Sequence, residues 1–425
     1  MQTNCHEHMN YRRYLLLLFV CTLGLLILAV ATNYIVDPYN IFGTPRIDGL
    51  NAVKPYAGDR GRIAKIYQVM DVKPKALIVG NSRPEIGLDP KHACWPRTAQ
   101  PVYNIALPGL SVLDQIRYAE HGIAAGDVKI VLIGLDFLDY LNRPNPNVDT
   151  HLWPPFAATG RSLVDVTGAP DPGFFRHRLT EMYNALVSLE TLTSSVTTVM
   201  QQRERYVETR TTPGFNPAEG IYQPIVQHEG VGVLFAQKNQ DLARRMTSGP
   251  WSLYQGNDLW SRDFEALQRF VTRATGNGIE VIPFINPYHG EYMVLLDLAG
   301  LWGQFEDWKR QVVEIMAAAE SMVLVWDFGD FGPYATEAVG DLAQTGQSLD
   351  WFWEPSHYKR ELGDKMLARI FADHCPETVS EDRFGTLLRP THLAVELTAL
   401  AAQRDRYMVQ NPQIVERLKE IIDRR

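Results

Sequence analysis

A long apolar segment near the N-terminus restricts how this chain can fold. Residues 14–36 hold no charged side chain, and a helix of about 20 apolar residues is enough to cross the hydrocarbon core of a membrane. Arg12 and Arg13 precede the segment, and Asp37 is the first charge after it. Because positive charges are retained in the cytoplasm, the pattern predicts a single-pass anchor in the inner (cytoplasmic) membrane. The tail 1–13 would then be cytoplasmic, and everything after Asp37 would be extracytoplasmic or periplasmic.

A cleaved signal peptide is the alternative for this segment. Ala29-Val30-Ala31 resembles a small-x-small cleavage site. The apolar region is longer than the roughly 7–15 residues of a signal peptide, which favours an uncleaved anchor. Both interpretations export the body of the chain, and the anchor interpretation makes membrane lipid a partner of residues 14–36.

The composition indicates a folded body that does not bind nucleic acid. The 425 residues are 45% hydrophobic and 21% charged, as in ordinary globular proteins. The net charge is −8, and the exported part has no dense run of Lys and Arg of the kind that binds nucleic acid. No phosphate-binding Gly-rich loop, dinucleotide fingerprint or zinc-binding spacing is present, so no cofactor and no metal are predicted. His6-Glu7-His8 resembles a metal clip but lacks further ligands.

Short apolar segments alternate with helical segments after the anchor. The pattern predicts an α/β fold with a mostly parallel sheet covered by helices on both sides, because strands buried on both faces are continuously apolar. Ligands of such sheets bind outside the carboxyl ends of the strands. The expected strands are 76–80, 102–106, 130–135, 279–285 and 322–327, and the expected helices are 111–124, 262–275, 304–320 and 358–371.

Two distant segments carry the residue types of acyl-transfer chemistry. Ser82 follows the first expected strand, and His357 comes three residues after Glu354, ahead of a helix. A serine nucleophile, a histidine base and an orienting carboxylate are the three parts that such chemistry requires. Three alternatives stay open: Ser82 as a helix N-cap, His357 as a capping or solvent-facing residue, and Asp327 or Asp330 as the acid.

Two cysteines of the exported part accompany these segments. Cys94 follows the serine segment and Cys375 follows the histidine segment. If the segments converge, a Cys94–Cys375 disulfide is expected in an oxidising compartment; the alternative is two buried free thiols.

Residues 142–261 and 378–425 depart from the strand–helix alternation. The first stretch is expected to be an insertion over the strand ends, with a helical region at about 174–205. Its aromatic residues would line a carbohydrate site or form a small core of their own. The second stretch, after an extracytoplasmic domain of residues 37–377, is expected to be a helical tail that packs on the domain or contacts a partner. The aromatic residues are Trp153, Phe156, Tyr183, Tyr222, Trp251, Tyr254 and Trp260.

Three short blocks resemble those of the SGNH (GDSL-like) hydrolases, in particular the membrane-anchored branch of alginate O-acetylation and teichoic-acid D-alanylation. The blocks are Gly80-Asn81-Ser82-Arg83, Asn104-Ile105-Ala106-Leu107-Pro108-Gly109 and Glu354-Pro355-Ser356-His357, with glutamate in place of the usual aspartate. The resemblance implies a three-layer, flavodoxin-like sheet, Ser82, Glu354 and His357 as catalytic residues, and the amide of Gly109 in an oxyanion hole.

The resemblance fails at one block. The family has Gly-x-Asn-Asp where this chain has Gly134-Leu135-Asp136-Phe137. Asp136 would place a negative charge where a hydrogen-bond donor is wanted, unless it is protonated or turned away. Asn81, Asn104 or Asn286 would then be the donor, and His289, just past a strand end, is expected to contact substrate or to be structural.

The expected function is that of a membrane-anchored serine esterase or O-acyltransferase acting on an ester of a cell-envelope polysaccharide. The resemblance implies an envelope glycan or its acylated precursor as a partner, and a multi-pass membrane acyltransferase as a further one. The alternative is an inactive protein of the same fold that serves as a scaffold or binding protein, and Asp136 favours it.

Overall fold

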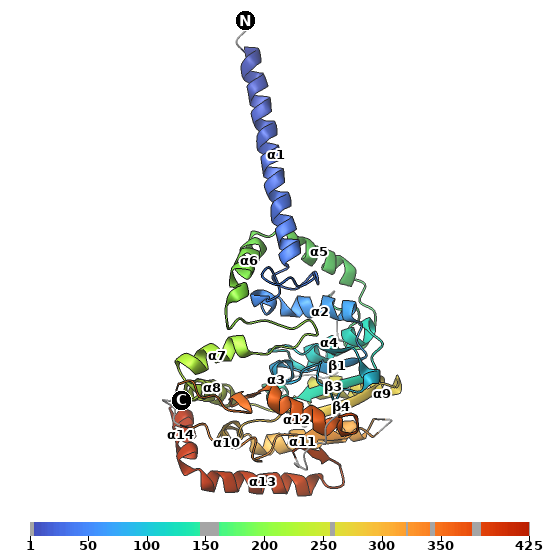
Figure 1. Cartoon of the computed structure of the whole chain (residues 1–425). Coiled ribbons are helices and arrows are strands. Elements are labelled where there is room, and N and C mark those ends of the chain that lie inside the picture. Colours follow the sequence, from blue (N-terminus) through green and yellow to red (C-terminus); the bar gives the residue numbers. More distant parts are fainter. Residues whose placement is uncertain are drawn as a thin grey trace.

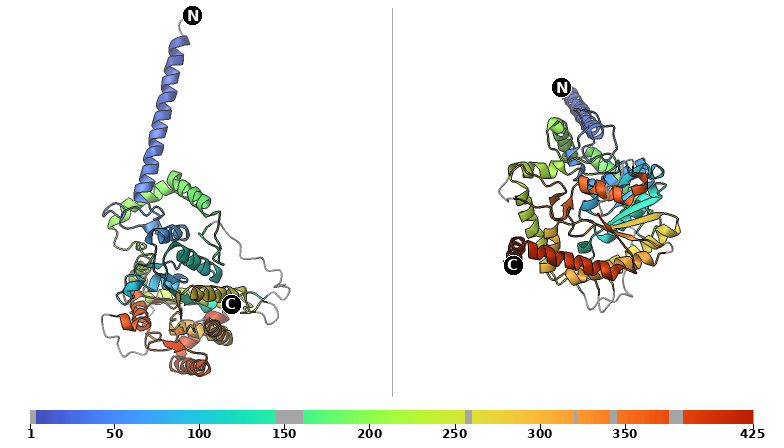
Figure 2. Two further views of the ribbon diagram at one scale, coloured as in Figure 1. Left: turned by 90° about the vertical axis from the view of Figure 1, so that its right-hand side faces the viewer. Right: turned by 60° about the horizontal axis from the view of Figure 1, so that its bottom comes forward.

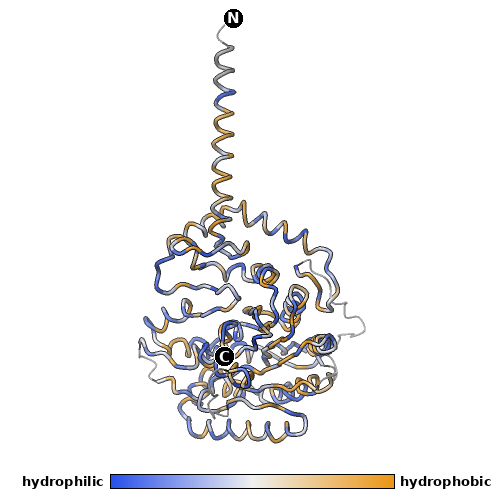
Figure 3. Tube along the Cα trace, turned by 45° about the vertical axis from the view of Figure 1, so that its right-hand side comes forward, coloured by the Kyte–Doolittle hydropathy of each residue, from blue (hydrophilic) through white to orange (hydrophobic). Residues whose placement is uncertain are grey.

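The computed structural model describes residues 4–144, 161–255, 260–319, 322–340, 345–375 and 384–424. Helix α1 (Asn4–Val36) projects from the body of the molecule (Figure 1). Its segment Tyr11–Val36, of 26 residues, is long and apolar enough to cross a membrane, and the hydropathy colouring of Figure 3 marks most of this helix as hydrophobic. The N-terminal part of the chain is thus consistent with a single-pass anchor.

A mostly parallel six-stranded sheet forms the centre of the body. The order is β2-β1-β3-β4-β5-β8, and only the edge strand β8 is antiparallel to its neighbour. All five expected strands are present, but β2 ends at Asn104, two residues earlier than expected, and β5 begins at Val325, three residues later than expected. The strands are β1 (Ala76–Val79), β2 (Val102–Asn104), β3 (Ile130–Leu135), β4 (Glu280–Ile285), β5 (Val325–Asp327) and β8 (Thr386–Leu388).

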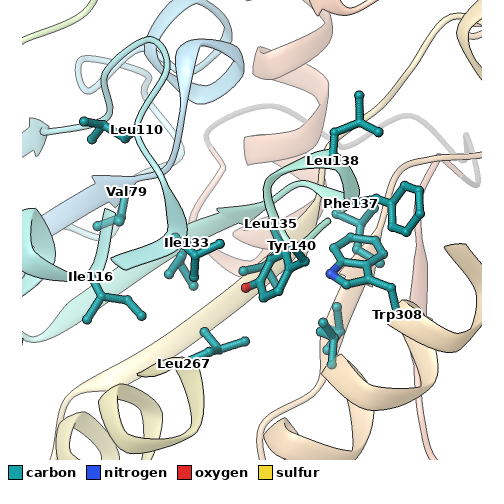
Figure 4. Packing of buried hydrophobic residues seen from close by; sticks show 14 of the residues in the cluster. Val79, Leu110, Ile116, Ile133, Leu135, Phe137, Leu138, Tyr140, Leu267 and Trp308 are labelled. Carbon is teal, nitrogen blue, oxygen red and sulfur yellow. The ribbon is translucent and has the colours of Figure 1, made fainter. Parts of the chain in front are cut away.

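Helices cover both faces of the sheet. Successive side chains of a strand point to opposite faces, and here each face packs against helices to form its own hydrophobic core. Leu77 and Val79 belong to one core, whereas Ala76 and Ile78 belong to the other. Figure 4 shows strand residues of the first core facing Ile116, Leu267 and Trp308. The expected helices are present with slightly shifted ends. The first core includes α2 (Gly61–Val72), α4 (Val112–Ala125), α9 (Arg262–Gly276) and α11 (Trp302–Ala317), and the second is covered by α12 (Arg360–Ile370), which packs on α3 (Ser82–Gly87).

The inserted stretch separates into two parts. Helices α5 (Phe174–Val187) and α6 (Leu189–Met200) pack against α1, whereas α7 (Glu219–His228) and α8 (Val231–Thr247) lie on the body, with α8 against β6. The expected helix at 174–205 is therefore broken, and Ser188 caps the second half by accepting a hydrogen bond from the Thr191 amide at 3.3 Å. Trp153 and Phe156 lie outside the described residues.

The C-terminal tail packs on the domain. It is not entirely helical as expected, because β8 precedes α13 (Leu393–Gln410) and α14 (Pro412–Asp423). On α14, Arg417 pairs with Glu291 of α10 (Gly290–Leu298) at 2.5 Å, and Asn239 of α8 donates to the same carboxylate at 2.6 Å. Figure 1 and the left view of Figure 2 show α13 at the end of the body opposite α1. Short 3-10 helices occur at Pro55–Ala57, Arg97–Ala99, Phe137–Asp139, Gln201–Arg203 and Ala372–His374.

A disulfide joins Cys94 and Cys375. It connects the segment after α3 to the segment after α12, across 281 positions of sequence. Of the two alternatives that the sequence left open for these cysteines, the structure has the disulfide. The serine and histidine segments therefore lie on elements that are covalently tied together.

Candidate active site

The nucleophile candidate lies in a tight turn between β1 and α3. Gly80 has a φ of +146°, and a Cβ there would lie 2.6 Å from Pro84 Cγ, so the turn requires glycine. The side chain of Asn81 accepts a hydrogen bond from the Arg83 amide at 3.0 Å and caps α3. Asn81, not Ser82, is thus the capping residue, and the interpretation of Ser82 as the N-cap is wrong.

This turn occupies the position where ligands bind in sheets of this kind. In the sheet, β2 lies on one side of β1, and β3, β4 and β5 follow on the other side. The connection from β1 to β2 and the connection from β2 to β3 therefore run in opposite directions, so the strand order reverses between β1 and β3. Ser82 follows β1 and Asp136 follows β3. Both residues therefore lie at the carboxyl ends of the two strands that flank this reversal.

The histidine segment is a small hairpin rather than a loop. Strand β6 (Phe352–Glu354) pairs antiparallel with β7 (His357–Tyr358), and Glu354 lies opposite His357. Cross-strand neighbours have closely spaced side chains, so the hairpin sets the carboxylate beside the imidazole. The sequence showed Glu354 and His357 three residues apart but did not reveal this pairing.

Ser82, His357 and Glu354 form a continuous hydrogen-bonded relay. Ser82 Oγ lies 2.7 Å from His357 Nε2, although the two residues are 275 positions apart. His357 Nδ1 is hydrogen-bonded to Glu354 Oε1, and the Ser356 amide donates to Glu354 Oε2 at 2.8 Å. Because His357 is buried and bonded through both ring nitrogens, the interpretation of it as a capping or solvent-facing residue is wrong.

Burial and pairing set the charge states of this relay. Burial alone would raise the pKa of Glu354, but His357 and further donors outweigh it and lower the pKa to about 2. Burial lowers the pKa of His357 below its usual 6.5, against the opposing effect of Glu354. Near neutral pH, Glu354 is therefore ionised and His357 is neutral, with Nδ1 donating to the carboxylate and Nε2 able to accept a proton from Ser82.

Two residues of the inserted stretch complete the surroundings of the relay. The Tyr222 hydroxyl of α7 lies 3.5 Å from His357 Nδ1, and its ring stacks on Trp353 with centroids 5.3 Å apart. Lys238 Nζ of α8 lies 3.8 Å from Glu354 Oε1. Tyr222 was one of seven aromatic residues expected in this stretch, whereas no sequence signal distinguished Lys238 from other helix-surface lysines.

A buried arginine neutralises the carboxylate that departs from the family pattern. Arg83 Nη1 forms an ion pair with Asp136, and both side chains are buried. Arg83 Nε also donates to the Ser356 carbonyl at 2.7 Å, and the guanidinium lies 5.1 Å from the centre of the Tyr288 ring. Asp136 is thus directed at Arg83, and Arg83 connects the serine turn to the histidine hairpin. Sequence reasoning missed this role of Arg83.

The three asparagines considered as oxyanion donors use their side-chain amides elsewhere. Asn81 Nδ2 donates to Asp139 at 3.0 Å, and Asn286 Nδ2 donates to the Leu135 carbonyl at 3.0 Å. Asn104 Nδ2 donates to the carbonyls of Pro84 and Leu88 at 2.8 and 3.0 Å. These amides hold the loops at the strand ends in place, which leaves backbone amides as the candidate donors.

The other polar residues singled out at the strand ends have structural partners. His289 caps α10 and is hydrogen-bonded through Nε2 to the Glu337 carbonyl at 2.8 Å. Asp327 pairs with Lys309 of α11 at 2.5 Å. Gly109 lies in an exposed turn after β2 with a φ of +64°, a conformation that favours glycine. The carboxylate beside His357 is therefore that of Glu354, and neither Asp327 nor His289 belongs to the relay.

The remaining described aromatic residues of the inserted stretch lie elsewhere. Trp251, Tyr254 and Trp260 pack against the first core, and Tyr254 stacks on Trp260 with centroids 4.4 Å apart. Tyr183 is 63% exposed on α5.

Across the described ranges, no group of three or more His, Cys, Asp or Glu is arranged to hold a metal ion.

Comparison with known proteins assigns no family to the chain. No family model matches the sequence, and no curated protein matches it. Its chemistry must therefore be inferred from the geometry of the site.

Proposed function

We propose that the protein is a membrane-anchored serine esterase or O-acyltransferase that acts on an ester of a cell-envelope polysaccharide. The observation that carries the proposal is the relay from the half-buried Ser82 through the buried His357 to the buried, ionised Glu354. A neutral histidine between a serine hydroxyl and a carboxylate is the arrangement that activates a serine nucleophile. The position of Ser82 at the carboxyl end of β1 supports the same conclusion.

In the proposed reaction, Ser82 Oγ attacks the carbonyl carbon of the ester while His357 Nε2 takes the hydroxyl proton. Glu354 stabilises the imidazolium that forms. The bond from the carbonyl carbon to the leaving oxygen then breaks, and Nε2 returns the proton to that oxygen. The acyl group on Ser82 is passed to water by an esterase or to a sugar hydroxyl by a transferase. His357 deprotonates the acceptor as it attacks, and then returns the proton to Ser82 Oγ as the bond between the carbonyl carbon and Oγ breaks.

The amides of Ser82 and Gly109 are the proposed oxyanion donors. Ser82 is the first residue of α3, and amides at a helix N-terminus point toward bound negative charge. The strand order β2-β1-β3-β4-β5 is that of flavodoxin-like sheets, which supports the resemblance to the SGNH hydrolases. The Arg83–Asp136 ion pair removes the objection that Asp136 would repel the oxyanion.

An envelope polysaccharide is proposed as the substrate because of the apolar helix α1. A domain held at the membrane surface meets glycans and their lipid-linked precursors there. A multi-pass membrane acyltransferase is the proposed donor partner in the transferase version of the reaction. An extracytoplasmic location of the site follows from the positive-inside pattern of Arg12 and Arg13.

An inactive scaffold of the same fold is the second candidate. The observation that favours it is that Asn81, Asn104 and Asn286 all use their side-chain amides for structural hydrogen bonds. An oxyanion hole without a side-chain donor stabilises the transition state less, since one such donor contributes about 10²–10³-fold to the rate.

Fluorophosphonate labelling of the full chain in detergent tests the proposal. We expect the wild type to be labelled and Ser82→Ala not to be labelled. Ser111→Ala is the matched control, because Ser111 is an exposed N-capping serine whose side chain accepts from the Asp114 amide at 3.2 Å, and this variant should label like the wild type. A folded wild type without labelling would support the scaffold instead.

The labelling rate should fall at acid pH. His357 must be neutral to accept the Ser82 proton, and burial lowers its pKa below 6.5. The rate should therefore be constant above about pH 7 and decline with a midpoint below 6.5 as the imidazole becomes protonated. Rates measured from pH 5 to pH 8, with circular dichroism at each pH to verify folding, check this expectation. A midpoint well above 6.5 would contradict the assignment of His357 as the base.

A further inference from the structure

Helices α5 and α6 form a hairpin that holds the base of α1. Asn33 Nδ2, near the end of α1, donates to the carbonyls of Leu186 and Ser188 at 2.9 and 3.1 Å. Ser195 Oγ of α6 donates to Asn33 Oδ1 at 3.2 Å. Figure 1 and the left view of Figure 2 show both helices at the end of the body from which α1 emerges. The hairpin is thus fixed to α1 at the corner between α5 and α6.

Helix α6 exposes apolar side chains and buries polar ones, the reverse of an ordinary surface helix. Leu189 and Met200 are 75% and 77% exposed, and Val196 is also exposed. The exposed carboxylate of this helix, Glu190, lies in its first turn and pairs with Arg60 at 3.4 Å. A helix on the surface of a soluble domain buries its apolar face and exposes its polar face. The outward face of α6 therefore suits an apolar environment rather than water. The buried face consists of hydroxyl residues, namely Thr191, Ser194, Ser195 and Thr198.

Helix α5 continues this outward apolar surface. Phe175, Leu179 and Tyr183 are each more than 60% exposed, and their spacing of four residues places them on one face of the helix. A surface of this kind on a folded domain marks an interaction site. Aromatic residues such as Phe175 and Tyr183 are typical of segments at the boundary between water and membrane.

The position of the hairpin along α1 identifies its partner. If the hydrocarbon segment begins near Tyr14, about 20 residues carry it to the vicinity of Asn33, where the hairpin is attached. A wholly apolar hollow of about 400 Å³ lies at this corner, where apolar residues of α1 adjoin Leu186 near the end of α5. The hollow is lined by Leu26, Ile27, Val30, Ala31, Tyr34 and Leu186.

We propose that α5 and α6 lie in the interface of the phospholipid bilayer, with their outward faces among the lipids. The domain then has two membrane contacts, the spanning helix and the interfacial hairpin, and is held against the membrane rather than suspended from it. The proposal depends on α1 crossing the membrane and is independent of the chemistry at Ser82.

Spin-label accessibility of the full chain in lipid nanodiscs tests this proposal. Single cysteines would be introduced as Leu179→Cys, Leu189→Cys and Met200→Cys after replacement of Cys5 and Cys21 by serine. Each labelled site is already exposed, so the label should leave the fold intact. Nanodiscs of phosphatidylethanolamine and phosphatidylglycerol, each holding one protein molecule, exclude contacts with a second copy.

Labels on α5 and α6 should collide more often with oxygen, which concentrates in lipid, than with a water-soluble nickel complex. Leu25→Cys in α1 is the control for lipid, and Val409→Cys is the control for water, since Val409 is 80% exposed on α13 far from α1. If Leu25 reports lipid while the hairpin labels behave like Val409, the proposal is overturned and a protein partner is the better explanation of the apolar faces. If Leu25 itself reports water, α1 does not cross the bilayer and the proposal falls with it.

Discussion

Replacing His357 by glutamine should lower kcat/KM for an activated aryl ester by about 10⁴-fold, the size of the loss when a serine relay is broken. Glutamine can still accept a hydrogen bond from Ser82 Oγ, which lies 2.7 Å from Nε2 in the wild type, but it cannot take the proton. The serine would then have to attack as an unactivated alcohol. Initial rates of ester hydrolysis by the full chain in detergent measure the effect.

His392→Gln is the matched control for this variant. His392 is exposed before α13, where Nδ1 lies 2.9 Å from the Thr391 hydroxyl, and its replacement should leave the rate unchanged. An activity of His357→Gln equal to that of the wild type would show that the relay is not used for catalysis. A wild type that is folded but hydrolyses no ester and accepts no fluorophosphonate would favour the scaffold.

Replacing Arg83 by methionine should lower the free energy of unfolding by about 3–5 kcal/mol, as expected when one member of a buried ion pair is removed. The variant leaves the carboxylate of Asp136 buried without its counter-charge. It also removes the bond from Arg83 Nε to the Ser356 carbonyl, at 2.7 Å, which holds the histidine hairpin. Denaturant unfolding of the full chain in micelles measures the loss.

A second substitution separates the effect of charge from that of packing. Adding Asp136→Asn to Arg83→Met removes the unpaired charge, so the double variant should recover part of the lost stability. Arg424→Met is the control for an exposed pair, since Arg424 and Glu420 lie 2.9 Å apart with both side chains more than half exposed, and should cost less than about 1 kcal/mol. A double variant no more stable than Arg83→Met would contradict the charge explanation.

Local sequence patterns predicted the elements whose signals are contained in a few neighbouring residues. The apolar segments of the five parallel strands are continuous because each strand is buried on both faces, and the anchor helix is apolar throughout. The types and spacing of Ser82, Glu354 and His357 also indicated serine chemistry. The strands β6, β7 and β8 were missed because each has only two or three residues and, unlike the expected strands, none extends into a longer apolar run that would mark it in the sequence.

The roles of single polar residues were not predictable from their neighbours. Asp136 looked like an unfavourable charge in the sequence, but its effect depends on Arg83, which follows a different strand. Asn81, Asn104 and Asn286 looked equally suited to an oxyanion hole, and each uses its amide in a contact with the backbone or a side chain of another segment. Tyr222 and Lys238 reach the relay only because α7 and α8 fold back onto the hairpin.

The sequence by itself determined the class of fold, the apolar N-terminal helix and the residue types of the relay, because burial and periodicity act on residues close together in the chain. The tertiary structure decided which carboxylate meets His357, how Asp136 is neutralised and which way the faces of α6 point. Those outcomes depend on contacts between segments separated by tens to hundreds of residues, and the free energy of a buried charge or an apolar face is set by what packs against it.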